Sequence, residues 1–154
     1  MRLTYADLLT LDRGLAALSA GKTQPDGTRK PYRLPAAAIL AAAQNTINVR
    51  KALEPYHAAA RDVFESMPHI TVPLKDGPGR QVAPTHVREF QQQTTALLNG
   101  LVTVKLFKIK GTDLKFGDKA DENDISHDTL ADLDRVLDRT GLIALEEAAE
   151  DEGA

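Results

Sequence analysis

The longest helical pattern in this sequence is LPAAAILAAAQNTINVRKALEPYHAAARDVFESM, residues 34–67. Pro35 fits the first turn of a helix, where its missing N–H would have no partner anyway. Alanine, the best helix former, fills most of residues 36–43. Apolar residues then recur at the spacing of a helix with one buried face; they are Ile39, Leu40, Ala43, Ile47, Leu53, Tyr56, Ala60, Val63, Phe64 and Met67.

Pro55 interrupts this pattern without ending it. A proline inside a helix removes one backbone hydrogen bond and costs about 3 kcal/mol. Because the apolar periodicity continues on both sides of Pro55, we predict one kinked helix rather than two separate helices. Pro68 stops the helix, since the residue before a proline is disfavoured in the helical conformation.

Three shorter helices are predicted on either side of the long one. The first begins at Thr4, which pairs with Asp7 as an acidic capping box, carries a leucine seam and ends at Gly21. The second begins at Thr85 and ends at Asn99-Gly100, and the third begins at the cap Ser126 and ends at Gly141. The inward faces comprise Leu8, Leu11, Leu15 and Leu18; then Val87, Phe90, Thr94, Leu97, Leu98 and Leu101; then Leu130, Leu133, Val136 and Leu137.

Two segments have the alternation of β-strands. Residues 69–82 combine Ile70, Val72 and Leu74 with the turn sequence DGPG, which predicts a hairpin with Pro73 at an edge. Residues 101–110, LVTVKLFKIK, form the best strand pattern in the chain. We therefore predict a mainly α (α+β) fold with four helices around one long kinked helix and a small antiparallel β element.

Length and composition indicate one folded unit. The 154 residues are 42% hydrophobic and 27% charged, which is typical of a globular chain. We expect a single helical domain over residues 1–145 and an acidic tail that frays over residues 146–154. No apolar run approaches the roughly 20 residues that span a bilayer, and the first residues lack the apolar stretch of a secretion signal. We expect no membrane association.

The residues that usually carry chemistry are scattered. The chain has no cysteine and only four histidines, His57, His69, His86 and His127, in no zinc-binding spacing. Residues 118–128 are rich in aspartate but lack the glycine of a calcium-binding EF-hand loop; a looser cation site from Asp121, Asp124 and Asp128 stays open. We expect no catalytic residue, no metal site and no cofactor, and therefore no enzyme.

The order of elements resembles small, uncharacterised helical proteins of tailed bacteriophages and prophages. The shared features are RLT at residues 2–4, LPA at 34–36, ALEP at 52–55, EF at 89–90 and the last helix capped by Ser126. The long basic loop at residues 21–33 departs from that pattern. The resemblance covers nearly the whole chain and implies a location in the host cytoplasm or the virion.

Our first functional hypothesis is a non-enzymatic phage-type structural or assembly protein. It would act through protein–protein contacts, as a homo-oligomer or with a virion or host protein. The strand predicted at residues 101–110 has apolar residues on both faces, and one of these faces has no assigned contact within the chain. This second face favours the assembly hypothesis. The expected interface residues are Tyr56, Val104, Leu106, Phe107 and Ile109.

A ligand-binding or host-regulating module, for example one that sequesters a nucleotide, is the alternative. The densest basic cluster, Lys22, Arg29, Lys30 and Arg33, lies in the loop at residues 21–33 and would contact the phosphates. Nineteen basic against 22 acidic residues, a net charge of −3, argue against a nucleic-acid partner. Only the lysines at 105, 108 and 110 would favour one.

Overall fold

The structure, a computed structural model, describes residues 1–114 and 123–139 of the chain. Within these residues lie four α-helices and two 3-10 turns: α1 (Tyr5–Ala20), α2 (Ala36–Ser66), η1 (Pro84–His86), α3 (Val87–Leu98), η2 (Gly111–Leu114) and α4 (His127–Asp132). Short strands accompany them, so the predicted mixture of four helices and antiparallel strands is confirmed. The expected acidic tail, Asp121 and Gly141 lie outside the described residues.

The first helix, α1, lies at the centre of the body. It contacts α2 and α4 extensively and α3 at fewer points. The predicted capping box is present: Asp7 N donates to Thr4 Oγ1, and Thr4 N donates to the Asp7 carboxylate. The leucine seam is buried as predicted, and Gly21 ends the helix at a φ of 78°, which a side chain would strain. The prediction that the other helices surround the long helix is not confirmed, because α1, and not α2, has extensive contacts with two helices and further contacts with a third.

The long helix α2 is continuous through Pro55, and the kink at this proline stays a prediction. The predicted apolar face is wrong over the first half of the helix, where Ile39, Leu40 and Ile47 are exposed. The buried residues of α2 are Ala38, Asn45, Val49 and Leu53. The helix can bury a face that contains Asn45 because the amide nitrogen and the amide oxygen each form a hydrogen bond with the backbone of Phe107.

In the part of the chain that the structure describes, four separate two-stranded ladders are present instead of the single β element that we expected. The antiparallel pairs are β1 (Arg2–Thr4) with β6 (Leu101–Thr103), β2 (Lys22–Thr23) with β3 (Arg29–Lys30), and β4 (His69–Leu74) with β5 (Gly77–Val82). The fourth pair, β7 (Ile109–Lys110) with β8 (Leu137–Asp138), is parallel. The hairpin at residues 69–82 is thus confirmed, although its turn lies at Lys75-Asp76 rather than at residues 76–79.

Several predicted boundaries require correction. The loop at residues 21–33 contains the β2–β3 hairpin, and the strand predicted over residues 101–110 is split into β6 and β7. The last helix, predicted to reach Gly141, ends at Asp132 and is followed by a turn that buries Leu133 and Val136. Thr85 does not cap α3, because it lies in η1 and its hydroxyl pairs with the His86 ring.

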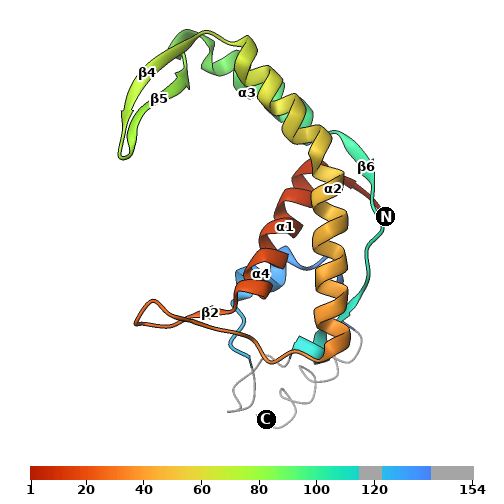
Figure 1. Cartoon of the computed structure of the whole chain (residues 1–154). Helices are drawn as coiled ribbons and strands as arrows, with labels where there is room; N and C mark the ends of the chain where they lie inside the picture. Colours follow the sequence, from red (N-terminus) through yellow and green to blue (C-terminus); the bar gives the residue numbers. More distant parts are fainter. Residues whose placement is uncertain (115–122, 140–154) are drawn as a thin grey trace, which may run out of the picture.

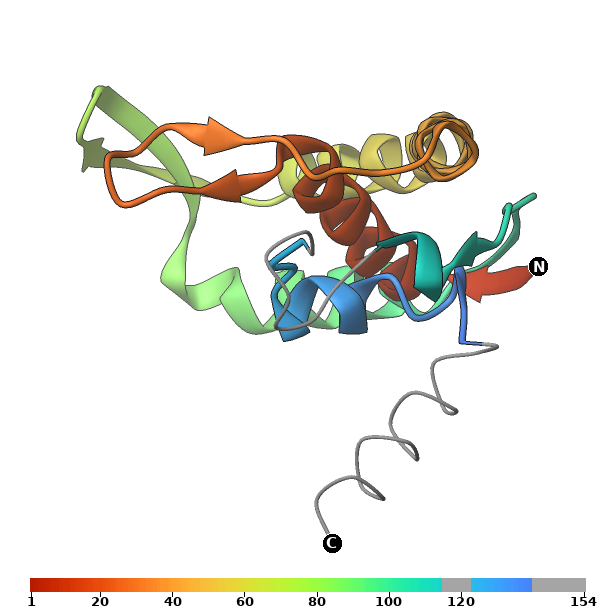
Figure 2. The same cartoon turned by 90° about the horizontal axis from the view of Figure 1, so that it is seen from below.

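The second half of α2, the β4–β5 hairpin, η1 and α3 form an arm, which we define as residues 57–98. Figure 1 shows α3 alongside the end of α2 and the hairpin extending away from the body. Figure 2, seen from below, shows α4 beside α1 and the β2–β3 hairpin projecting from the end of α1. The main hydrophobic core is built from α1, the first half of α2, and residues near β7, η2, α4 and β8, and no residue of the arm belongs to it.

Candidate functional site

The residues predicted to form a protein interface do not share an open surface. Val104 and Ile109 are buried in the main core, and Leu106 and Phe107 are half-buried against it or beside it. Tyr56 is also half-buried, with its ring 5.5 Å from that of Tyr5. Val104 and Ile109 therefore expose almost no side-chain surface that a partner could contact.

Asn45 and Asn48 of α2 bind the backbone of residues 105–107, which follow the β1–β6 ladder and precede β7. Asn45 is fully buried; its Nδ2 donates to Phe107 O at 2.8 Å, and its Oδ1 accepts from Phe107 N at 2.7 Å. One turn later, Asn48 Nδ2 donates to Lys105 O at 2.9 Å. The two amides thus satisfy backbone groups that a neighbouring strand would otherwise pair. The sequence analysis singled out neither residue, because it followed only the apolar positions of the helix.

The arm is held together by a cluster around Phe64. The Phe64 ring lies 6.2 Å from Phe90 of α3 and 4.4 Å from His69 of β4. Arg80 of β5 lies over the same ring and forms an ion pair with Glu65 at 3.0 Å. This cluster joins the hairpin to α2, but it is small. Met67 and Val82 are the only arm residues in the buried hydrophobic set.

One face of the β4–β5 hairpin is apolar and open. Ile70, Val72 and Leu74 alternate along β4, so they share this face. Opposite Val72 and Leu74 stand two glycines of β5, which leave the apolar side chains without cross-strand cover. Ile70 and Leu74 are exposed. We call these three residues the hairpin face.

A second apolar surface lies on the first half of α2. Ile39, Leu40 and Ile47 are 55%, 63% and 66% exposed, and the exposed Ala36 and Ala43 lie on the same side. We call these five residues the α2 face. A pocket beside the α2 face, of about 260 Å³, is lined by apolar residues of α1 and α2 and by Pro31, Tyr32 and Leu34.

The basic cluster lies on the β2–β3 hairpin and the segment that follows it. Lys22 and Lys30 face each other in register, and Lys22 forms an ion pair with Asp124. Arg33 is exposed, and its backbone is anchored by two hydrogen bonds to the Asn123 side chain. The hairpin thus brings Lys22, Arg29 and Lys30 near one another, but Lys22 is already paired.

An open cleft of about 410 Å³ lies beside this cluster. Its lining includes two of the predicted cations, Lys22 and Arg29, together with Tyr32, Asp124, Ser126 and Thr129. Burial raises the pKa of the Tyr32 phenol, which therefore stays protonated and neutral at physiological pH. The cleft offers an arginine and hydroxyl groups to an anion, and the Asp124 carboxylate opposes one.

The remaining candidates are not gathered into a catalytic group. The His57 ring meets the Tyr56 ring edge to face, His86 pairs with Thr85, and His69 belongs to the Phe64 cluster. In residues 1–114 and 123–139, no three histidine, aspartate or glutamate side chains are grouped as metal ligands. Of the three proposed cation ligands, Asp124 pairs with Lys22, Asp128 lies in the first turn of α4, and Asp121 lies outside the described residues.

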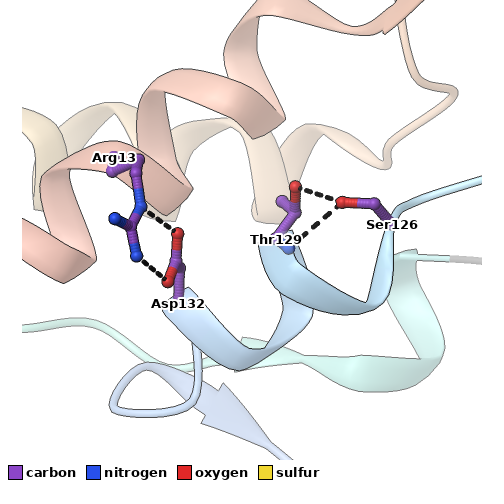
Figure 3. Close-up of polar contacts among 4 residues, drawn as sticks. All are labelled: Arg13, Ser126, Thr129 and Asp132. Carbon is purple, nitrogen blue, oxygen red and sulfur yellow. Dashed lines mark hydrogen bonds and ion pairs between the residues drawn. The ribbon is translucent and has the colours of Figure 1, made fainter.

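Two ion pairs fix α1 to the segment around α4. Arg13 donates two hydrogen bonds of 2.6 Å to the Asp132 carboxylate, beside the Ser126 cap on Thr129 (Figure 3). The Arg13 hydrogen bonds hold the pKa of Asp132 below its usual value. Hydrogen bonds from Thr4, then from Arg135, lower the pKa of Asp7. These carboxylates serve the packing of the body rather than a reaction site.

No protein-family model, curated protein or solved structure matches this chain. Among the described residues, no helix is both long and apolar enough to cross a membrane. The function of the surfaces described above is therefore inferred from the geometry of this chain alone.

Proposed function

We propose that this chain is a non-enzymatic structural or assembly protein that acts through protein–protein contacts as a homo-oligomer. The observation that carries this proposal is the arm, which extends from the body and buries very little of its own apolar surface. A partner that covers the arm would supply the missing burial.

The energetics of the hairpin support this proposal. A two-stranded hairpin is marginally stable in water unless it packs against another element. Its connection to the rest of the arm is the small cluster around Phe64, while Ile70 and Leu74 stay exposed. Exposed apolar patches bordered by polar residues commonly mark sites of protein–protein contact. The hairpin face is therefore the surface that we assign to the first contact.

We further propose that Pro55 bends α2 where the arm leaves the body. A proline inside a helix is a common cause of a kink, and Pro55 lies between the last α2 residue in the main core, Leu53, and the first arm residues. The bend would set the direction in which the hairpin face is presented. The resemblance to small proteins of tailed phages adds the proposal of a role in the virion or the host cytoplasm.

The test compares two adjacent residues of β4 that point to opposite faces. Ile70→Lys places a charge on the hairpin face, while Thr71→Lys places the same charge on the other face. Light scattering should give the wild type and Thr71→Lys a multiple of the 16.7 kDa chain mass, and Ile70→Lys a smaller particle. A wild-type chain that stays monomeric at high concentration would refute the homo-oligomer.

The cleft beside the β2–β3 hairpin favours a second candidate function, the binding of a phosphate-bearing ligand such as a nucleotide. Arg29 lines this cleft, whereas Lys30, its neighbour in β3, does not. A nucleotide that binds there should raise the melting temperature by mass action. The increase should be lost in Arg29→Ala and kept in Lys30→Ala. No increase at millimolar nucleotide would exclude this function.

A further inference from the structure

We propose that the β4–β5 hairpin packs face to face with the same hairpin of a second copy, so that the two hairpins form a four-stranded sandwich of two layers. This inference rests on the proposed assembly through the hairpin face and adds how the two copies meet. Prolines at both edges of the hairpin oppose the alternative mode, in which the sheets of two copies join edge to edge.

The two sides of the hairpin have different surroundings. His69 and Arg80 lie on one side, because residues directly opposite each other in a ladder share a face, and both contact Phe64 of α2. The hairpin face is the other side, so it points away from α2. The hairpin extends from the body (Figure 1), and a second copy can therefore reach this open side.

Glycines make the hairpin face flat. Gly77 and Gly79 lie on this face, opposite Leu74 and Val72. A Cβ at Gly79 would collide with the Leu74 side chain, which shows that Leu74 lies across β5 over the glycine. The apolar side chains of β4 therefore cover both strands as one layer. Such a layer is typical of the inner face of a β-sandwich, where two sheets pack about 10 Å apart.

The charges of the hairpin favour a second copy as the occupant. The remaining residue of this face, Gln81, is neutral, so two copies of the face bring no like charges together. The turn at the tip carries one charge of each sign, Lys75 and Asp76. A flat, uncharged face is complementary to itself, as a two-fold interface requires. Four strands in two layers also supply the packing that a two-stranded hairpin lacks.

Two prolines oppose the addition of a strand at either edge. Ala83 N donates to Pro68 O in the register of the ladder, so every second pair from there is hydrogen-bonded. The pair of Pro73 and Pro78 falls between these pairs, so the backbone groups of both prolines are directed outward, one at each edge. Because proline has no N–H, an added strand would lack a donor at this point of either edge.

Single cysteines at adjacent residues of β4 test the mode of contact, because the chain has no cysteine of its own. Val72→Cys lies at the centre of the hairpin face, whereas Thr71→Cys lies on the opposite face, with its backbone groups at the outer edge. A short bismaleimide that spans the sheet separation of about 10 Å should join two Val72→Cys chains at least tenfold faster than two Thr71→Cys chains. Equal rates, or faster joining of the Thr71→Cys chains, would overturn the face-to-face packing.

Thr71→Pro provides a second measurement. It removes an outward N–H at the β4 edge and no hydrogen bond of the ladder, so face-to-face packing should keep the dissociation constant within about twofold of the wild type. An assembly that forms in the wild type and is lost in Thr71→Pro would overturn the face-to-face packing and leave the proposed function standing. A wild-type chain that stays monomeric at high concentration would overturn both.

Discussion

Replacing Asn45 with alanine removes the buried amide that holds residues 104–108 against α2. Both hydrogen bonds of this amide go to Phe107, to its carbonyl oxygen at 2.8 Å and to its N–H at 2.7 Å. Alanine leaves both backbone groups without a protein partner and leaves space where the amide was. Phe107 lies between Val104 and Ile109, which are both part of the main core, so the loss acts on the stability of the body.

The expected cost follows from these two groups. An unsatisfied buried donor or acceptor costs about 1–3 kcal/mol. Because Phe107 is only half-buried, water can satisfy part of the need, and we expect Asn45→Ala to lower the free energy of unfolding by about 3 kcal/mol. For a chain of this size, this corresponds to a fall in melting temperature of about 6–12 °C.

Denaturant titration followed by circular dichroism measures this loss. Asn48→Ala is the matched control, since it removes one hydrogen bond to Lys105 O on the same helix and should cost about 1 kcal/mol. Asn45→Asp keeps the acceptor for Phe107 N–H but buries a charge, so at neutral pH it should destabilise the protein more than alanine does. If Asn45→Ala costs no more than Asn48→Ala, residues 104–108 are held by something other than the Asn45 amide.

The other predictions concern α1 and its contact with α4. Gly14→Ala places a Cβ 2.8 Å from the Asp132 Cβ and should destabilise the protein by about 1–3 kcal/mol, despite the better helix propensity of alanine; a stabilised variant on thermal melting would refute this close approach. Thr4→Ala removes the cap that binds Asp7 N and should cost about 1–2 kcal/mol, whereas Thr4→Ser should retain most of the stability in the same melt. The Asp132 pKa is lowered by Arg13, so its stabilising effect is complete above the unfolded pKa near 3.9 and is lost as the pH falls through the lower folded value. Asp132→Asn should thus be less stable than the wild type at pH 7, and urea titrations should show the difference shrinking toward pH 2; a difference that is constant with pH would contradict the pKa shift.

Local chemistry was sufficient to predict the ends of α1. The Thr4 and Asp7 side chains bind backbone groups three residues away, and Gly21 supplies a positive φ that other residues avoid. These interactions involve neighbours in the sequence, so a pattern of a few letters contains them. The Ser126 cap was predictable for the same reason.

The buried face of α2 and the division of the strand at residues 101–110 were not predictable in this way. Both depend on Asn45, which contacts Phe107 62 residues away. Periodicity counted Ile39 and Ile47 as core residues because it could not know that a satisfied asparagine takes the buried position. Asn45 and Asn48 are three residues apart and so lie on one side of the helix. This spacing is only a weak signal of burial, because nothing in the sequence identifies the backbone groups that the two side chains bind.

The candidate surfaces were predictable only in part. The basic cluster was found from the local density of Lys22, Arg29, Lys30 and Arg33, and the β2–β3 hairpin brings these residues together as a short loop would. The hairpin face and the α2 face were missed as surfaces, because a sequence gives apolar residues but not what covers them. The hairpin face is exposed because the arm is separate from the main core, and the α2 face is exposed because α2 buries its opposite side, which contains Asn45.

The most direct test of assembly through the arm is amide hydrogen exchange of residues 69–82 at increasing protein concentration. If copies of the chain cover the hairpin face, exchange in β4 and β5 should slow as the concentration rises from micromolar to millimolar. Exchange in α1, which is buried within one chain, should stay constant, and Ile70→Lys should abolish the effect. Exchange in the hairpin that is equally fast at every concentration would contradict the account.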